Sequence, residues 1–259
     1  MQTYLKSKTQ SFLNRYPKVF FCHVPKCAGV SLSNAIYDSL YPKLFKVTRF
    51  ASSIDLKGSR ISSELLGIDM MEARESQLIT MLNNKHQKFA TGHCRTRPEI
   101  VEKFGDEWDF VTILRDPVKR FVSEYVYNRY KQSDWLTHED SIDAYLESER
   151  ALISSTTYAR FFSSYSSSSS VLNNEKDAIQ SAVNNLKQYA LVGTLEELAA
   201  WKHNFERNFN VQLKIQNKNS TPNDEESKKV YANEKVMAKI RDLVSVDDEI
   251  YRAFTDDSA

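Results

Sequence analysis

Short apolar runs alternate along the chain with longer segments in which apolar residues recur every three or four positions. The β-rich runs are residues 19–23, 88–91, 110–114, 189–192 and 212–215, and helical patterns lie between them. Strands that alternate with helices in this way are typical of a parallel sheet with helices on its faces. The pattern therefore predicts an α/β fold with a central, mainly parallel sheet flanked by helices.

The pattern is weaker in the segment from Leu44 to Asn84 and in a serine-rich stretch. Residues 52–59 contain serines and a glycine that indicate a loop, whereas residues 72–82 indicate a helix. Residues 163–170 are nearly all serine and too polar to pack. We expect this stretch to be a mobile surface loop, and a plain linker is favoured over a functional lid.

The last third of the chain is predicted to be mostly helical. The sequence Thr194-Leu195-Glu196-Glu197 has a capping-box pattern, and apolar residues at 198, 201, 205 and 209 continue one helix face. Residues 217–220 form a polar loop before Pro222, and residues 224–254 predict one or two helices. Because no repeat or linker interrupts the chain, we expect residues 1–259 to form a single domain.

Composition narrows the function classes. The 259 residues are 41% hydrophobic and 27% charged, which is ordinary for a globular enzyme with a sizeable core. The formal net charge of +1 argues against a general nucleic-acid binder, for which a strong basic excess is expected. No sustained apolar run opens the chain, so we expect neither a secretory signal nor a membrane-spanning helix.

Residues 23–32, His-Val-Pro-Lys-Cys-Ala-Gly-Val-Ser-Leu, have the pattern of a strand–loop–helix junction that binds an anion. The N–H groups and positive dipole end of the helix would face the loop. Lys26 adds a mobile charge, Gly29 permits close approach of the backbone, and Ser31 adds a hydroxyl. The lysine precedes the glycine and there is no second glycine, so the common nucleotide-triphosphatase loop is disfavoured.

A second strand–loop–helix pattern runs from Trp108 to Tyr127. Residues 110–114 form the apolar run, and Pro117 stands where the first helical turn would begin. Arg115 closes the predicted strand and Ser123 lies about two helical turns farther on. Both side chains could therefore converge on one phosphate.

These two segments resemble the donor-binding motifs of the sulfotransferases, with the closer likeness to the carbohydrate branch that includes the heparan and dermatan 2-O-sulfotransferases and bacterial relatives. The matching stretches are Pro-Lys-Cys-Ala-Gly-Val-Ser-Leu at 25–32 and Leu-Arg-Asp-Pro-Val-x-Arg-x-x-Ser-x-Tyr at 114–125. The resemblance continues through Thr91-Gly92-His93 and through residues 191–196. It implies a P-loop-like sulfotransferase fold and 3′-phosphoadenosine 5′-phosphosulfate as donor.

The resemblance assigns the site residues by position. The first loop would bind the 5′-phosphosulfate and the second motif the 3′-phosphate. The residues concerned are Lys26, Cys27, Ala28, Gly29, Val30, Ser31 and Leu32 in the first site, and Arg115 and Ser123 in the second. Cys27 and Val30 stand where many relatives have hydroxyl residues, so backbone amides would carry more of the binding. Residues 217–220 lie where relatives bring a basic loop over the nucleotide, although an exposed turn is favoured here.

His93 is the best candidate for the base that activates the acceptor, because its ordinary pKa lies near neutral pH. Alternatively, His93 is a buried imidazole whose role is to form hydrogen bonds with backbone groups. His23 is the rival base, although a packed strand residue is equally plausible. The residues Glu64, Glu72 and Glu75 could also serve, and Arg95 and Arg97 could bind an anionic acceptor or be solvated charges. The remaining histidines, His86, His138 and His203, have the sequence context of surface residues.

The cysteines, Cys22, Cys27 and Cys94, are odd in number and form no Cys-x-x-Cys pair, which favours a reducing compartment and small buried side chains. Their spacing with the nearby histidines matches no common zinc motif, and no metal is expected. Animal Golgi members of the family usually carry an N-terminal anchor. Without one in this sequence, we expect a soluble, cytoplasmic, bacterial protein.

The leading hypothesis is a sulfotransferase that acts on a hydroxyl of a carbohydrate or sugar-like acceptor, with Lys26 at the leaving oxygen and His93 as base. O- or N-sulfation of a small natural product in bacterial secondary metabolism is an alternative. A nucleotide kinase is disfavoured by the position of the lysine. A nucleotide-binding module without transfer activity is the alternative from another class.

Overall fold

The computed structural model describes residues 2–131, 136–216 and 223–255. Its sheet has four parallel strands in the order β2-β3-β1-β4. The strands are β1 (Val19–Cys22), β2 (Ala51–Ser53), β3 (Phe89–Gly92) and β4 (Asp109–Thr112). Parallel bridges from Val111 to Leu191 and from Leu114 to Thr194 extend the sheet beyond β4. The predicted α/β class with a central parallel sheet is confirmed.

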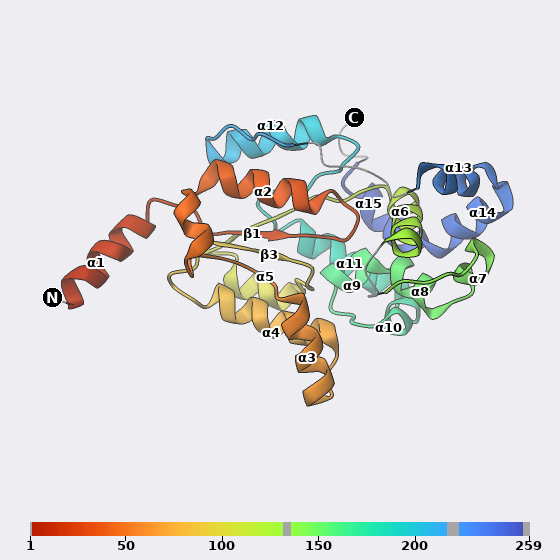
Figure 1. Cartoon of the computed structure of the whole chain (residues 1–259), viewed down its shortest axis with the longest axis horizontal. Helices are drawn as coiled ribbons and strands as arrows, with labels where there is room; N and C mark the ends of the chain where they lie inside the picture. The colour runs from red at the N-terminus through yellow and green to blue at the C-terminus, as the bar shows by residue number, and fades with distance from the viewer. Residues whose placement is uncertain (1, 132–135, 217–222, 256–259) are drawn as a thin grey trace.

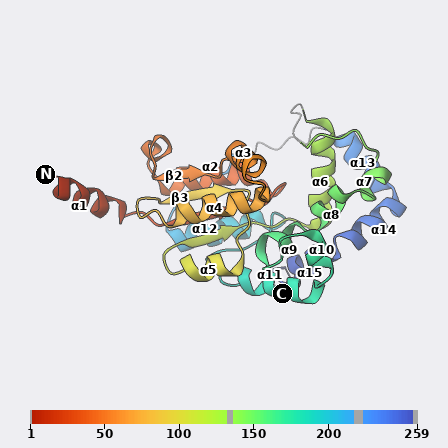
Figure 2. The same ribbon diagram turned by 90° about the horizontal axis from the view of Figure 1, so that it is seen from below.

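Helices cover both faces of this sheet (Figure 1). On one face lie α2 (Gly29–Leu40) and α12 (Leu198–Phe209), and on the other lie α3 (Leu56–Leu66), α4 (Met70–Leu82) and α5 (Pro98–Phe104). The short 3-10 helix η1 (Lys43–Val47) leads from α2 toward β2. Helix α1 (Gln2–Leu13) projects from the body of the molecule in both views (Figures 1 and 2).

The remaining helices gather beyond one end of the sheet (Figure 1). They are α6 (Pro117–Tyr130), α7 (Ile142–Leu146), α8 (Glu149–Ser155), α9 (Thr157–Phe162), α10 (Ser168–Leu172), α11 (Glu175–Leu186), α13 (Asp224–Ala232), α14 (Glu234–Leu243) and α15 (Ser245–Arg252). Part of this group has its own apolar cluster, in which Phe121 of α6 packs with Tyr145 of α7 and Ile240 of α14. Helix α6 therefore links the sheet to the second cluster.

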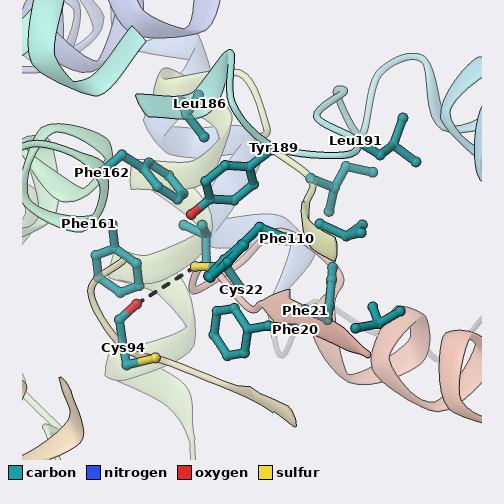
Figure 3. Close-up of a cluster of buried hydrophobic side chains, with 14 of the residues drawn as sticks. Phe20, Phe21, Cys22, Cys94, Phe110, Phe161, Phe162, Leu186, Tyr189 and Leu191 are labelled. Atoms are coloured by element: carbon teal, nitrogen blue, oxygen red, sulfur yellow. Dashed lines mark hydrogen bonds between the residues drawn. The ribbon is translucent and has the colours of Figure 1, made fainter. Parts of the chain in front are cut away.

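Aromatic side chains fix the two strands that lead into the predicted motifs (Figure 3). The ring centroids of Phe20 on β1 and Phe110 on β4 are 5.8 Å apart, and Tyr189 lies 5.6 Å beyond Phe110. Phe162 of α9 packs edge-on against Tyr189 at 5.9 Å. Each such buried side chain contributes roughly 2–3 kcal/mol of hydrophobic stabilisation. An aromatic cluster thus holds β1 and β4 together in the core.

Two strand and loop predictions were wrong. Residues 212–215 form no strand, and only Leu213 among them is buried. Of residues 52–59, expected to be a loop, residues 52–53 belong to β2 and residues 56–59 to α3, and only residues 54–55 connect them without regular structure. Pairing with β3 overrides the low strand preference of the serines. The Asp55 carboxylate accepts a hydrogen bond from the Gly58 amide at 2.9 Å. This bond caps α3, so the helix begins at this point although its first turn contains a glycine.

The loop prediction for the serine-rich stretch holds for residues 163–167 and is wrong for residues 168–170. Ser163 is buried at the end of α9, and the chain then forms α10 from Ser168. The Ser167 and Ser170 hydroxyls form a reciprocal capping box at the start of that helix. Serine hydroxyls that bond nearby amides can therefore begin a helix where composition alone suggests a linker.

The capping box predicted at residues 194–197 does not form. Thr194 bridges to Leu114 in the sheet, and α12 begins only at Leu198 without a side-chain cap. Residues 224–254 contain three helices rather than one or two, because Asn233 ends α13 and caps α14, where its side chain accepts from the Val236 amide at 3.2 Å. The predicted polar loop 217–220 lies outside the described residues.

Candidate active site

Three strands end level with one another and deliver the candidate residues to one edge of the sheet. Cys22 of β1 is in register with Gly92 of β3 and with Thr112 of β4. The residues that follow these strands, including His23 and His93, therefore leave the sheet at the same edge. In parallel α/β sheets this carboxyl edge is where ligands bind.

The first loop has a backbone conformation suited to an anion. Lys26 and Ala28 have left-handed φ angles of 66° and 56°, whereas Cys27 between them does not. Alternation of this kind directs successive amides into a concavity. Within the described residues, no acceptor is found for the amides of Gly29, Val30 and Ser31, which open α2. The start of α2 is therefore a ready site for a phosphate or sulfate group.

The side chains of this loop divide into two groups. Cys27 and Leu32 are fully buried in the core, so only their backbone can face a ligand. The side chain of Val30 is 64% exposed, and the Ser31 hydroxyl bonds no described residue. Beside Ser31 lies a pocket of about 250 Å³ lined by Ser31, Asn34, Ala35, Asp38, Lys214 and Gln216.

Gly29 makes room for the His23 ring. A Cβ atom at Gly29 would lie 1.6 Å from Cδ2 of His23, so no other residue fits without moving the ring. The His23 ring in turn packs on that of His93, with centroids 4.0 Å apart. The glycine thus allows the anion loop to sit directly against the histidine pair.

The hydrogen bond of His93 defines its tautomer. Its Nδ1 lies 2.5 Å from the carbonyl oxygen of His23, which can only accept, so Nδ1 carries the proton. In the neutral ring Nε2 then has the free lone pair. Burial lowers the pKa of His93 below 6.5, and nearby Lys26 acts in the same direction. The ring is therefore neutral at pH 7, in the form that accepts a proton at Nε2.

His23 has a different environment. Burial lowers its pKa well below the ordinary value, and His93 and Lys26 lower it further. Its ring is wedged between Gly29 and His93. These contacts support a packing role for His23.

The second motif meets the first through Arg115. One guanidinium nitrogen, Nη1, donates to the Lys26 carbonyl at 3.1 Å. Asp116 caps α6 by accepting from the Lys119 amide at 2.8 Å, which confirms the predicted helix start at Pro117. Ser123 lies partly exposed on α6, and none of the described residues bonds its hydroxyl. The hydrogen bond from Arg115 to the Lys26 carbonyl therefore joins the two predicted anion-binding segments.

Lys26 is held by an aromatic ring. Its Nζ lies 3.6 Å from the centroid of Tyr127, which is one helical turn beyond Ser123 on α6. Burial lowers the pKa of Lys26 to about 8, and the charges of Arg115 and Lys131 add to the shift while Glu124 opposes it. The lysine is thus still mostly protonated at pH 7.

Tyr158, which the sequence analysis missed, links both loops from α9. Its hydroxyl accepts from the Arg115 amide at 2.9 Å, donates to the Arg115 carbonyl at 2.5 Å and lies 3.7 Å from the Cys27 sulfur. The buried Asp247 of α15 accepts from the amides of Tyr158 and Ala159 at 2.9 and 3.1 Å. Nothing in the local sequence marks these residues, because their partners lie far away along the chain.

A buried ion pair supports α6 from within. The side chain of Arg120 is fully buried and bonds Glu124 at 2.6 Å. Its other terminal nitrogen donates to the Ser154 carbonyl and to the Ser154 hydroxyl, and that hydroxyl bonds Glu124 at 2.9 Å. Arg120, for which the sequence predicted no role, therefore has a structural one. Its burial shows this role, whereas its spacing in the motif does not.

The other acidic candidates for a base have different surroundings. Glu75 is buried and forms a two-point ion pair with Arg97, with both N–O distances at 2.7 Å. Glu64 pairs with Arg60 on α3, and Glu72 is exposed. Glu75 and Arg97 line a cavity of about 750 Å³ between α4 and α5, with Glu72, Ile79, Thr80, Asn83, Glu99, Ile100, Lys103 and Phe104.

The structure contradicts one of the two alternatives for Arg95 and the surface position expected for His138. Arg95 is fully buried, 3.7 Å from Glu75, rather than a solvated charge. His138 is buried with its ring stacked on Tyr145 at 4.9 Å, because aromatic packing outweighs the polar local sequence. His203 is exposed on α12 and His86 is partly buried.

The three cysteines are buried and unbonded to one another, as predicted. Burial raises the pKa of Cys27 to about 11. Across the described ranges, no cluster of three or more histidine, cysteine or acidic side chains is placed to hold a metal ion. None of the helices in the described part of the chain is both long and apolar enough to cross a bilayer.

The parallel α/β sheet, with two strand–loop–helix junctions at its carboxyl edge, has the architecture of a nucleotide-binding or group-transfer enzyme. A model of the sulfotransferase family matches residues 9–256. The match covers nearly the whole chain, and the chain belongs to this family, whose members transfer sulfuryl groups. A search of curated proteins found no similar chain.

Proposed function

We propose that the protein transfers the sulfuryl group of 3′-phosphoadenosine 5′-phosphosulfate to a hydroxyl of a carbohydrate or sugar-like acceptor. The observation that carries this proposal is the hydrogen bond from Arg115 to the carbonyl of Lys26, 3.1 Å long. This bond brings the two predicted anion-binding segments into contact, which supports a single donor site, and the His23–His93 pair lies against the same loop.

The proposed roles follow from the chemistry of the transfer. The acceptor oxygen attacks sulfur, the bond from sulfur to the phosphate oxygen breaks, and the acceptor proton moves to Nε2 of His93. The Lys26 ammonium stabilises the charge that develops on the leaving phosphate oxygen. The amides of residues 29–31 hold the 5′-phosphate end, while Arg115 and Ser123 hold the 3′-phosphate.

The pH dependence of kcat/KM for the donor follows from two pKa shifts. Because His93 acts as base, the rate falls as pH drops through its pKa, which lies below 6.5. Because Lys26 acts as a cation, the rate falls as pH rises through its pKa of about 8. We expect a bell-shaped profile whose acidic limb disappears in His93→Ala and whose alkaline limb disappears in Lys26→Ala.

The first test is binding of the desulfated product. Adenosine 3′,5′-bisphosphate should raise the melting temperature by mass action, and ATP should do so less well because it lacks a 3′-phosphate. Equal stabilisation by the two nucleotides would overturn the assignment of Arg115 and Ser123 to that group.

The second test is turnover of the phosphosulfate with a panel of glycans and small alcohols. Lys26→Ala and His93→Ala should each lose roughly a hundredfold or more in kcat with retained fold. His203→Ala, which changes an exposed histidine on α12, should keep the wild-type rate. Bisphosphate binding without turnover of any acceptor would identify a binding module instead of an enzyme.

A further inference from the structure

The ammonium of Lys26 has an aromatic partner in place of a carboxylate. Its Nζ lies 3.6 Å from the ring centroid of Tyr127, well inside the limit of about 6 Å for a cation–π contact. No ion pair to Lys26 is found within the described residues. The Tyr127 ring is therefore the nearest group that stabilises this cation.

The charges around Lys26 compete for its position. Glu124 from α6 attracts it, whereas Arg115 and Lys131 repel it, and Cys27, the next residue of the loop, is fully buried. The Glu124 carboxylate already bonds Arg120 and Ser154. A lysine that moved onto Glu124 would compete with these bonds and would leave the anion loop. The Tyr127 ring occupies the place that keeps the ammonium beside the loop.

The position of Tyr127 on α6 fits this role. Ser123 and Tyr127 are four residues apart and so share one helix face. The Nζ of Lys131, at the end of the same helix, also lies 5.6 Å from the centroid of this ring. The ring therefore contacts two cations, Lys131 and Lys26. The aromatic face thus connects the second motif of the site with the lysine of the first.

We propose that Tyr127 is a positioning residue for sulfuryl transfer, whose ring face holds the Lys26 ammonium at the anion loop where the leaving oxygen is to be met. The proposal rests on the proposed function, in which Lys26 stabilises that oxygen. Tyr127 acts through Lys26 and needs no contact with the donor. The ring is required and the phenol hydroxyl is not, because the cation lies over the ring face.

The kinetic test compares Tyr127→Phe, Tyr127→Leu and Tyr130→Leu. Tyr127→Leu should lower kcat by roughly five- to tenfold with little change in the KM for the donor, since a cation–π contact of this exposure is lost. Tyr127→Phe should restore the wild-type rate. Tyr130 is a matched control on α6, because it has nearly the same exposure, 39% against 40%, and also lies under a cation, Arg129. An equal loss in Tyr130→Leu, or no rescue by Tyr127→Phe, would overturn the proposal.

A second readout needs no turnover. The pH dependence of Lys26 acylation by acetic anhydride, followed by peptide mass spectrometry on the folded protein, gives the pKa of this amine. Loss of the ring removes a group that favours the charged form, so the pKa should fall by roughly half to one unit in Tyr127→Leu and stay unchanged in Tyr127→Phe. An unchanged pKa in Tyr127→Leu would overturn the positioning role. A shifted pKa in a protein that transfers no sulfuryl group would retain the Lys26–Tyr127 contact and reject the proposed function.

Discussion

Removal of one hydroxyl, in Tyr158→Phe, tests whether a single side chain braces both anion-binding segments. The phenol makes two hydrogen bonds to the Arg115 backbone, at 2.9 and 2.5 Å, from a fully buried ring. Phenylalanine keeps the ring and its packing. Any effect therefore comes from the lost bonds and from the contact with the Cys27 sulfur at 3.7 Å.

The expected magnitude follows from the backbone groups left without a partner. Each net hydrogen bond is worth about 1 kcal/mol, and an unpaired buried amide adds a desolvation cost of about 1–3 kcal/mol. Because Arg115 is only partly buried, water can replace some of the loss. We expect Tyr158→Phe to lower the free energy of unfolding by about 2–3 kcal/mol. Release of the Arg115 backbone should also weaken bisphosphate binding by roughly tenfold.

The assay is urea unfolding followed by circular dichroism, together with calorimetric titration of the bisphosphate. Tyr165→Phe is the matched control, since its hydroxyl bonds Asp177 at 2.6 Å on the surface. That variant should leave both stability and binding essentially unchanged. If Tyr158→Phe matches the control in both measurements, the brace between the loops does not exist.

The remaining predictions concern the first loop. Gly29→Ala places a Cβ 1.6 Å from Cδ2 of His23, so it should lower the free energy of unfolding by about 3 kcal/mol or more. Adding His23→Ala to the same chain should recover part of that loss in urea unfolding. Additive losses from the two substitutions would reject the steric conflict. For Lys26, the folded pKa of about 8 lies below the ordinary 10.5, so the unfolded chain binds more protons between these values. Stability relative to Lys26→Met should therefore rise with pH across that window, by up to about 3 kcal/mol, and a flat difference would show that burial does not shift the lysine.

The sequence predicted those parts of the candidate site whose residues are close together along the chain. The anion loop at 23–32 and the strand, arginine and helix start at 114–117 are contiguous patterns with a direct physical meaning. The structure places both where expected, because parallel strands bring their carboxyl ends to one edge. The predicted strand at 189–192 is reduced to one isolated bridge, from Leu191 to Val111 of β4, while the bridge from Thr194 to Leu114 lies beyond both the predicted range and β4.

The parts that the sequence missed depend on contacts between distant segments. Tyr158 reaches Arg115, and Asp247 reaches Tyr158, across long separations that carry no periodic signal. The serine-rich stretch shows a different limit. Its composition indicates a linker. The hydroxyls of Ser167 and Ser170 nevertheless bond the free amides at the start of α10, and Val171 of that helix is buried in the core. Local hydrogen bonding and tertiary packing together outweigh composition there.

The partners of the basic residues distinguish charges that are neutralised within the protein from charges that are not. Arg120 and Arg97 are each neutralised by a carboxylate, Glu124 at 2.6 Å and Glu75 at 2.7 Å. In the part of the chain that the structure describes, Lys26 and Arg115 form no such ion pair: the first lies over an aromatic ring and the second bonds a carbonyl oxygen. Neither partner carries a compensating charge, so the positive potential of both side chains remains available to an anion. A donor with two phosphate ends can therefore bind without first breaking a salt bridge, whereas at Arg120 or Arg97 it would have to displace a carboxylate.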